Sequence, residues 1–146
     1  MQLKFHSSED GHGNGPNGTG ALTTLSGAFK DQPYSAKTRF ESDDGRAGTN
    51  PEELVAAAHA GCYAMALSFG LTKAGHEPTE LRAVATVAMD KLDAGWSITG
   101  IHLDVTGKVA GIEASQFGDA AEAAKKGCPI SRALASVPIT LTAKLA

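Results

Sequence analysis

Two cysteines are the residues of this sequence with the clearest capacity for chemistry. Cys62 lies inside the almost entirely apolar stretch NPEELVAAAHAGCYAMALS at 50–68, and Cys128 lies in GCPIS at 127–131. In a reducing compartment two cysteines normally remain thiols, and a structural disulfide is the least expected use of such a pair. The pair is therefore either core filler or redox chemistry.

The two thiols are expected to differ in reactivity. Cys62 lies about eleven residues into its predicted helix, beyond the reach of the N-terminal dipole, and burial among apolar neighbours raises the pKa of a thiol. Cys128 precedes Pro129 at the start of a short helical run, where free backbone N–H groups stabilise a thiolate. From local sequence, Cys128 is expected to be the more reactive thiol.

Capping signals define the helix that carries Cys62. Asn50 is a good N-cap, Pro51 suits the first helical position, and Glu53 stands where a capping box places its carboxylate. Gly75 offers a stop after residue 73 or 74. The helix has no polar stripe, so we expect it to be buried nearly all round, with a second subunit supplying part of the packing. The alternative is a central helix wrapped by its own sheet.

The other segments predict an α+β fold in one domain, 1–146, because the sequence has neither an internal repeat nor an alternating βαβ series. The predicted elements are a long turn at 7–20, strands at 20–29 and 36–41, a turn at 42–48, a hairpin over 81–109 with a bulge at Gly100, helices at 115–126 and after Pro129, and a strand at 138–146.

Composition excludes several classes of function. A net charge of −3 with 20% charged residues gives no electrostatic reason to expect a nucleic acid or a membrane as partner. The N-terminus lacks the features of a signal peptide, so a cytoplasmic location is expected. The histidines show no metal-ligand spacing and neither cysteine belongs to a CxxC pair, so no metal and no cofactor is implied.

Four strings carry a resemblance to a known family: QPYSAKTRFE, TNPEELVAAAHAGCYAMALS, KLDAGWSIT and AKKGCPISRAL. Together they resemble the OsmC/Ohr family of bacterial hydroperoxide reductases, and within it the osmotically inducible protein C branch. The resemblance extends from about Gly20 to the end of the chain. It implies an intertwined homodimer with long central helices enclosed by two β-sheets and with active sites at the subunit interface.

The resemblance also implies four site residues. Cys62 in HAGCY matches the peroxidatic cysteine, and Cys128 in GCP matches the resolving cysteine. Arg39 in KTRFE matches the arginine that faces the reactive sulfur, and Glu52 in NPEE matches the carboxylate that orients it. The implied activity is a thiol-dependent peroxidase that reduces organic hydroperoxides, with hydrogen peroxide a less expected substrate. It passes through a Cys62 sulfenic acid and a Cys62–Cys128 disulfide, which a dithiol such as a dihydrolipoyl group reduces.

These roles agree with the chemistry of the residues. An always-charged guanidinium can stabilise first the thiolate and then the departing oxygen, so without Arg39 a buried Cys62 is expected to remain an inert thiol. Glu52 and Cys62 are ten positions apart on one predicted helix, a rise of about 15 Å. We therefore predict that Glu52 serves the site of the partner chain.

Other interpretations remain open. The same disulfide could act in a redox-sensing or interaction module without turnover, and a Cys62–His59 pair would suit acyl transfer, although a lone buried histidine is more often a hydrogen-bonded core residue. Glu53 is expected only to cap its helix, and Arg46 is a weaker candidate for a second cation. The other branch of the family carries its arginine in the N-terminal hairpin turn, and the absence of arginine from GHGNGPNG favours Arg39.

Overall fold

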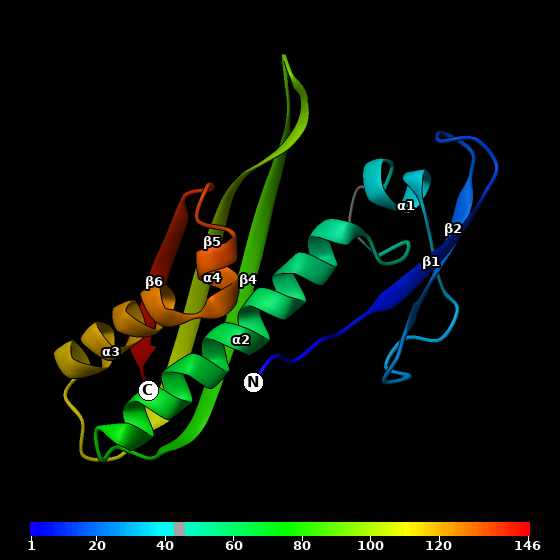
Figure 1. Cartoon of the computed structure of the whole chain (residues 1–146). Helices are drawn as coiled ribbons and strands as arrows, with labels where there is room; N and C mark the ends of the chain where they lie inside the picture. Colours follow the sequence, from blue (N-terminus) through cyan, green and yellow to red (C-terminus); the bar gives the residue numbers. More distant parts are fainter. Residues whose placement is uncertain (43–45) are drawn as a thin grey trace. The chain divides into compact units, whose positions relative to one another are not determined.

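The structure, a computed structural model, describes residues 1–42 and 46–146. The chain forms two compact units, residues 1–54 and 55–146, and each contains a three-stranded sheet (Figure 1). The predicted α+β class is confirmed by these two sheets and the long helix α2 (Pro51–Lys73). The prediction of one domain over 1–146 stays a prediction.

The N-terminal unit is built on an antiparallel sheet in the order β1-β2-β3, formed by Ser7–His12, Thr19–Thr24 and Gln32–Ser35. Strand β1 corrects the sequence prediction, which placed these residues in a long turn. Its side chains are all exposed, so no alternation of polar and apolar residues marked it as a strand. Its backbone nevertheless pairs with β2 along its full length, and the turn is confined to the residues between them.

A short helix, α1 (Ala36–Phe40), replaces the strand predicted at 36–41. Ser35 Oγ accepts a hydrogen bond from Thr38 N at 3.2 Å, and Thr38 Oγ1 accepts one from Ser35 N at 3.0 Å. This reciprocal capping starts a helix where six residues of alternating polarity suggested a strand. Of the turn predicted at 42–48, residues 43–45 lie outside the described part of the chain.

The bounds of α2 (Pro51–Lys73) are those predicted from its caps. Asn50 Oδ1 accepts the hydrogen bond from Glu53 N at 2.8 Å, as expected of an N-cap. The Glu53 carboxylate accepts a bond from the Thr49 hydroxyl at 2.6 Å, so it belongs to the helix start as expected. Gly75, with φ of 85°, follows the last turn in the left-handed conformation that ends helices.

The second sheet has the order β4-β5-β6. Strands β4 (Pro78–Leu92) and β5 (Gly95–Val109) form the predicted hairpin, and β6 (Ile139–Leu145) pairs with β5 in parallel. The register shift lies between Ala88, which faces Gly100, and its neighbour Met89, which faces Ile98. The predicted bulge is thus confirmed next to Gly100.

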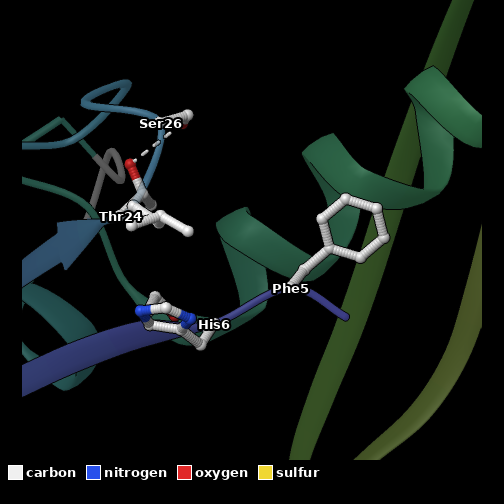
Figure 2. A pocket seen from close by; sticks show the side chains of 6 residues that line it. Phe5, His6, Thr24 and Ser26 are labelled. Atoms are coloured by element: carbon white, nitrogen blue, oxygen red, sulfur yellow. Dashed lines mark hydrogen bonds between the residues drawn. The ribbon is translucent and has the colours of Figure 1, made fainter. Parts of the chain in front are cut away.

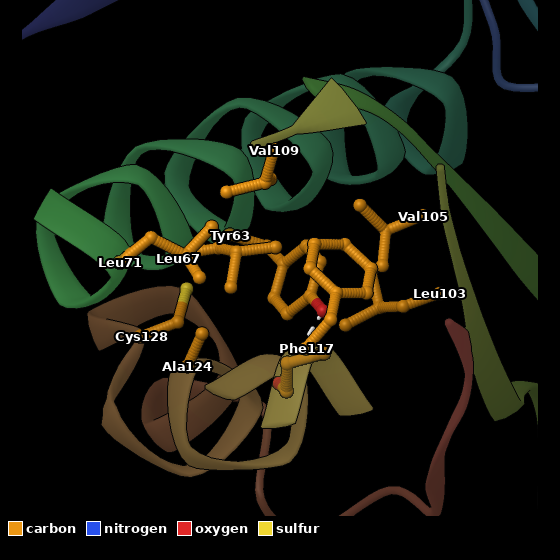
Figure 3. Packing of buried hydrophobic residues seen from close by; sticks show 10 residues of the cluster. Tyr63, Leu67, Leu71, Leu103, Val105, Val109, Phe117, Ala124 and Cys128 are labelled. Atoms are coloured by element: carbon orange, nitrogen blue, oxygen red, sulfur yellow. Dashed lines mark hydrogen bonds between the residues drawn. The ribbon is translucent and has the colours of Figure 1, made fainter. Parts of the chain in front are cut away.

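Helices α2, α3 (Ala114–Gly127) and α4 (Pro129–Ala133) enclose the core of this unit together with β5. Four residues of α2 at four-residue spacing are fully buried, namely His59, Tyr63, Leu67 and Leu71. Phe117 of α3 and Leu103 of β5 lie against this stripe (Figure 3). The Tyr63 hydroxyl donates to the carbonyl of Ala121 at 3.3 Å, which ties α2 to α3.

The opposite side of α2 is not covered within the single chain. Met65 is 62% exposed and Phe69 is 71% exposed in the single chain. Large apolar side chains on a helix at this exposure need a cover, and the second subunit that we expect there stays a prediction. By length and composition alone α2 could cross a membrane, the one such helix among the described residues, but the core helix of a soluble protein passes the same test.

Candidate active site

The two cysteines lie side by side, although they are far apart in the sequence. Cys62 Sγ of α2 is 3.0 Å from Cys128 Sγ, and both cysteines are free thiols. Cys128 is fully buried, whereas Cys62 is partly exposed. A disulfide needs a sulfur–sulfur distance of about 2.05 Å, so the pair is unbonded and close enough for a small movement to join it.

Cys128 is held by the junction of two helices. Its backbone N–H donates to the carbonyl of Ala124 at 2.8 Å and so closes α3. Its carbonyl accepts from Arg132 N at 3.0 Å and so opens α4, with Pro129 at the first helical position, as predicted. A residue fixed on both sides in this way has little backbone freedom, and its side chain points toward α2 (Figure 3).

The two thiols differ in acidity in the single chain. Burial raises the pKa of Cys62, and the contact with Cys128 raises this pKa further. Burial opposes ionisation of Cys128 too, but hydrogen bonds from Cys62 and Ser131 outweigh burial and lower the pKa of Cys128. Cys128 is therefore the stronger acid, as its local sequence predicted. Cys62 needs a cation to become a thiolate.

His59 does not form the Cys–His pair considered for acyl transfer. Its Nε2 lies 2.7 Å from Ser131 Oγ, and its Nδ1 is buried without a hydrogen-bond partner. Neither ring nitrogen therefore bonds Cys62, and the interpretation as a hydrogen-bonded core histidine is confirmed. Burial lowers the pKa of His59, so the ring is neutral at pH 7.

Arg39 and Glu52 form a bidentate ion pair within the N-terminal unit. Arg39 Nη2 donates to Glu52 Oε1 at 2.6 Å, and Arg39 Nε donates to Glu52 Oε2 at 3.0 Å. The side chains are 33% and 14% exposed. The guanidinium carbon lies 4.9 Å from the ring centroid of Phe40. A guanidinium held by two parallel bonds and an aromatic ring has a fixed orientation, and the catalytic role of this pair stays a prediction.

A hollow of about 550 Å³ adjoins Arg39 in the same unit. The residues that line it are Gly15, Pro16, Tyr34, Ser35, Ala36, Arg39, Phe40 and Glu41. Apolar and aromatic surface beside one guanidinium group suits an amphipathic molecule with an electron-rich polar end.

A second hollow, of about 780 Å³, contains none of the four predicted site residues (Figure 2). It is lined by Phe5, His6, Ser7, Thr24, Leu25 and Ser26. Among the described residues, no group of three or more His, Cys, Asp or Glu could hold a metal ion. Arg46 is exposed, and its suggested role as a second cation stays a prediction.

Comparisons with known sequences define the class of protein. The family described as OsmC-like protein matches residues 42–142. The chain is 45% identical over 145 residues to peroxiredoxin OsmC of Escherichia coli strain K12, covering 98% of this chain and 99% of that protein. It is 34% identical over 95 residues to the organic hydroperoxide resistance protein OhrA of Bacillus subtilis strain 168, covering 64% and 65% of the two chains. The chain belongs to the OsmC family.

Solved structures agree with this fold. The organic hydroperoxide resistance protein OhrB of Bacillus subtilis has a TM-score of 0.70 at 24% identity, covering 97% of this chain and 98% of that one. An OsmC-like protein from Mycoplasma pneumoniae has a TM-score of 0.77 at 12% identity, covering 100% and 99%. The fold is OsmC-like, and α2 is the core helix of a soluble protein of this family.

Sequence reasoning missed Ser131, which contacts His59 at 2.7 Å and contributes to the lowered pKa of Cys128. The available signal was spacing, because Ser131 follows Cys128 by three positions just as Cys62 follows His59. Nothing else in the run ISRALAS, residues 130–136, indicated that this serine would be buried.

Proposed function

We propose that the protein is a cysteine-based peroxidase that reduces organic hydroperoxides at the expense of a dithiol. The observation that carries this proposal is the 3.0 Å separation of the Cys62 and Cys128 sulfur atoms in a chain of the OsmC family. The names of two relatives support the same chemistry: peroxiredoxin OsmC of Escherichia coli and the organic hydroperoxide resistance protein OhrA of Bacillus subtilis.

In the first step Cys62 is the nucleophile. Its thiolate attacks the distal oxygen of the hydroperoxide, so that an S–O bond forms and the O–O bond breaks. The alkoxide takes a proton and leaves as an alcohol, and Cys62 becomes a sulfenic acid. The Arg39 guanidinium stabilises the thiolate before the attack and the alkoxide after it. Because burial raises the pKa of Cys62, the positive charge is needed to lower this pKa again.

In the second step Cys128 resolves the sulfenic acid. Its thiolate attacks Cys62 Sγ, an S–S bond forms, the S–O bond breaks, and the hydroxide leaves as water after taking a proton. The lowered pKa of Cys128 raises the fraction of this cysteine that is thiolate, and a faster resolution limits the time in which a second peroxide could overoxidise Cys62. A dithiol then reduces the disulfide. A dihydrolipoyl group is the reductant that the family resemblance suggests.

The active unit in this proposal is an intertwined homodimer. Glu52 and Cys62 both lie in α2, ten positions apart, which corresponds to a rise of about 15 Å. Arg39 is bound to Glu52 of its own chain. We propose that this pair serves Cys62 of the partner subunit, which would also cover the exposed Met65 and Phe69. Each chain then contributes one domain, 1–146, in the cytoplasm.

The preference for organic hydroperoxides rests on the hollow beside Arg39. Tyr34, Phe40 and Pro16 line it together with the guanidinium group. The apolar side chains would bind the alkyl or aryl group, and the guanidinium would bind the peroxide oxygens. Hydrogen peroxide has no apolar part to bury, so its reduction is expected to be the less efficient reaction.

Steady-state consumption of cumene hydroperoxide with dihydrolipoamide tests the proposal. Wild type should turn over, Cys62→Ser should be inactive, and Cys128→Ser should stall after one turnover. Arg39→Ala should be slowed by at least about a hundredfold, as expected when an electrostatic stabiliser is lost. If wild type forms its disulfide once and no dithiol recycles it, the peroxidase proposal fails and the redox-sensing module takes its place.

A further inference from the structure

His59 and Ser131 make a buried contact that the two-step mechanism does not use. His59 is 0% exposed and Ser131 is 5% exposed, and His59 Nε2 lies 2.7 Å from Ser131 Oγ. The other ring nitrogen of His59, Nδ1, is buried without a partner. A buried polar atom without a hydrogen bond is unfavourable. The presence of a histidine at this core position therefore needs an explanation in its other contacts.

The same two segments carry the thiols. Cys62 follows His59 by three positions in α2, and Ser131 follows Cys128 by three positions at the start of α4. Residues three apart lie on the same face of a helix. The contact between His59 and Ser131 at 2.7 Å and the contact between the two sulfur atoms at 3.0 Å are therefore neighbouring links between α2 and α4.

The burial of His59 decides where its hydrogen lies. Because burial lowers the pKa of His59, the ring is neutral and carries one N–H. A hydrogen on Nδ1 would be a buried donor without an acceptor, which is rarer in proteins than an unpaired acceptor. Nε2 therefore carries the hydrogen and donates to Ser131 Oγ. The hydroxyl hydrogen of Ser131 is then free to serve another acceptor.

We assign Cys128 Sγ, three positions before Ser131 in the same short run, as that acceptor. Burial opposes the Cys128 thiolate, and the groups that overcome burial are the Cys62 thiol, the backbone N–H and the hydroxyl of Ser131, and the backbone N–H of Ile130. A hydrogen bond to an anion is stronger than one to a neutral acceptor. The Ser131 hydroxyl therefore favours the thiolate of Cys128 over its thiol.

We propose that His59 and Ser131 are a positioning pair for the resolving cysteine: His59 orients Ser131, and Ser131 holds Cys128 as a thiolate beside Cys62. This inference rests on the proposed peroxidase function. In the step concerned, the Cys128 thiolate attacks the Cys62 sulfenic acid, the S–S bond forms, and the S–O bond breaks. The Cys128 thiol gave its proton to solvent when it ionised. The leaving hydroxide takes one proton from solvent, so the product is water. His59 and Ser131 end the step in their original protonation states.

Variants of the pair should slow resolution without slowing the attack on peroxide. Reduced protein is mixed with one equivalent of cumene hydroperoxide, quenched at intervals, and analysed for peroxide, sulfenic acid and disulfide. In Ser131→Ala and His59→Leu, disulfide formation should be about tenfold slower, the initial loss of peroxide should stay within about twofold, and more Cys62 sulfenic acid should be trapped by dimedone. His59→Gln keeps an N–H donor and should recover most of the rate.

A measurement without peroxide separates this inference from the proposed function. In a Cys62→Ser background, the pH midpoint of Cys128 alkylation by iodoacetamide should rise by about half a unit or more in Ser131→Ala and His59→Leu, and His59→Gln should restore it. A merely structural role would not shift this midpoint. Failure of wild type to consume peroxide would reject the peroxidase, whereas an unchanged alkylation midpoint in both variants would overturn the positioning pair.

His102→Leu is the matched control. His102 also contacts a hydroxyl group, with Nδ1 at 2.7 Å from Thr140 Oγ1, but this contact joins β5 to β6 and is among partly exposed residues. Its loss should leave both the rate of disulfide formation and the Cys128 midpoint unchanged. An equal effect in His102→Leu would show that any histidine–hydroxyl contact matters in the same way, and this too would overturn the inference.

Discussion

At the scale of single residues, the central question is how each of the two thiols, one fully buried and one partly buried, becomes a thiolate. Hydrogen bonds from its immediate neighbours lower the pKa of Cys128, because they outweigh the burial that opposes ionisation. At Cys62 the backbone N–H of Ile130 acts in the same direction, but burial outweighs it and raises the pKa of this thiol. The two cysteines therefore depend on different parts of the molecule, Cys128 on its own helix junction and Cys62, in our proposal, on Arg39.

Replacement of Arg39 should expose this dependence. In Arg39→Ala, the pH midpoint of Cys62 alkylation, followed by peptide mass spectrometry, should rise by at least about one unit because the stabilising cation is lost. Arg39→Lys keeps the charge but not the two parallel bonds to Glu52 and should give an intermediate midpoint. Arg82→Ala removes an exposed cation of β4 and serves as the control. A midpoint that is the same in Arg39→Ala and wild type would contradict the role of Arg39.

His59 should make the folded state sensitive to acid. Its pKa lies below the ordinary value of 6.5 because of burial, so below pH 6.5 the unfolded chain binds a proton that the folded chain does not. The free energy of unfolding should therefore decrease as the pH is lowered below 6.5. The contribution of this group is at most about 1.4 kcal/mol per pH unit. Urea unfolding between pH 7.5 and 5.5 should show a smaller fall in His59→Gln. An equal fall in both proteins would show that His59 has no depressed pKa.

At the scale of elements, the prediction succeeded where local chemistry decides the structure. The start and end of α2 depend on Asn50, Pro51 and Gly75, whose effects act within a turn of the chain. The prediction failed at β1, where pairing with β2 rather than a buried face defines the strand. It failed again at α1, where the Ser35–Thr38 capping bonds override a short alternating pattern.

The same limit applies to the candidate site. The cysteines stood out by their setting, whereas Arg39 and Glu52 were proposed from the family resemblance alone, and their roles stay a prediction. Ser131 could not be found in either way, because its importance comes from a contact with His59, a residue 72 positions away in the chain. Long-range contacts of this kind leave no periodic or compositional signal in a single sequence.

The N-cap of α2 should be measurable as stability. Asn50→Ala removes the side-chain acceptor for the backbone N–H of Glu53 and should lower the free energy of unfolding by about 1 kcal/mol. Asn17→Ala, in the exposed turn before β2, is the matched control and should change it by less than about 0.5 kcal/mol. Both values can be obtained from urea unfolding. A loss in Asn50→Ala no greater than in the control would mean that the cap contributes nothing to this helix.

At the scale of the whole molecule, the dimer determines which subunit supplies the cation. The Arg39–Glu52 pair is formed within one chain, and the two sulfur atoms are also within one chain. If the pair of one subunit serves Cys62 of the other, each active site combines two chains. The exposed Phe69 and Met65 on α2 identify an apolar face that association would bury.

Mixed dimers test this arrangement. As pure proteins, Cys62→Ser is expected to be inactive and Arg39→Ala to be slowed by at least about a hundredfold. In a mixed dimer, the Cys62→Ser subunit still provides Arg39 and the Arg39→Ala subunit still provides Cys62. If the cation acts across the interface, one of the two sites in a mixed dimer is intact. Unfolding and refolding an equal mixture makes about half of the dimers mixed. The mixture should therefore regain up to about a quarter of wild-type activity. A mixture that stays inactive would place Arg39 and Cys62 of the same chain in one site.

The most direct test of the two-cysteine peroxidase is a single turnover. Fully reduced protein receives one equivalent of cumene hydroperoxide per chain, the alcohol is quantified, and the peptides are mapped by mass spectrometry without reduction. The 3.0 Å separation of the sulfur atoms predicts one alcohol per chain and one disulfide between Cys62 and Cys128 of the same chain. Intact peroxide, or peroxide consumed while Cys62 remains a free thiol, would contradict the mechanism.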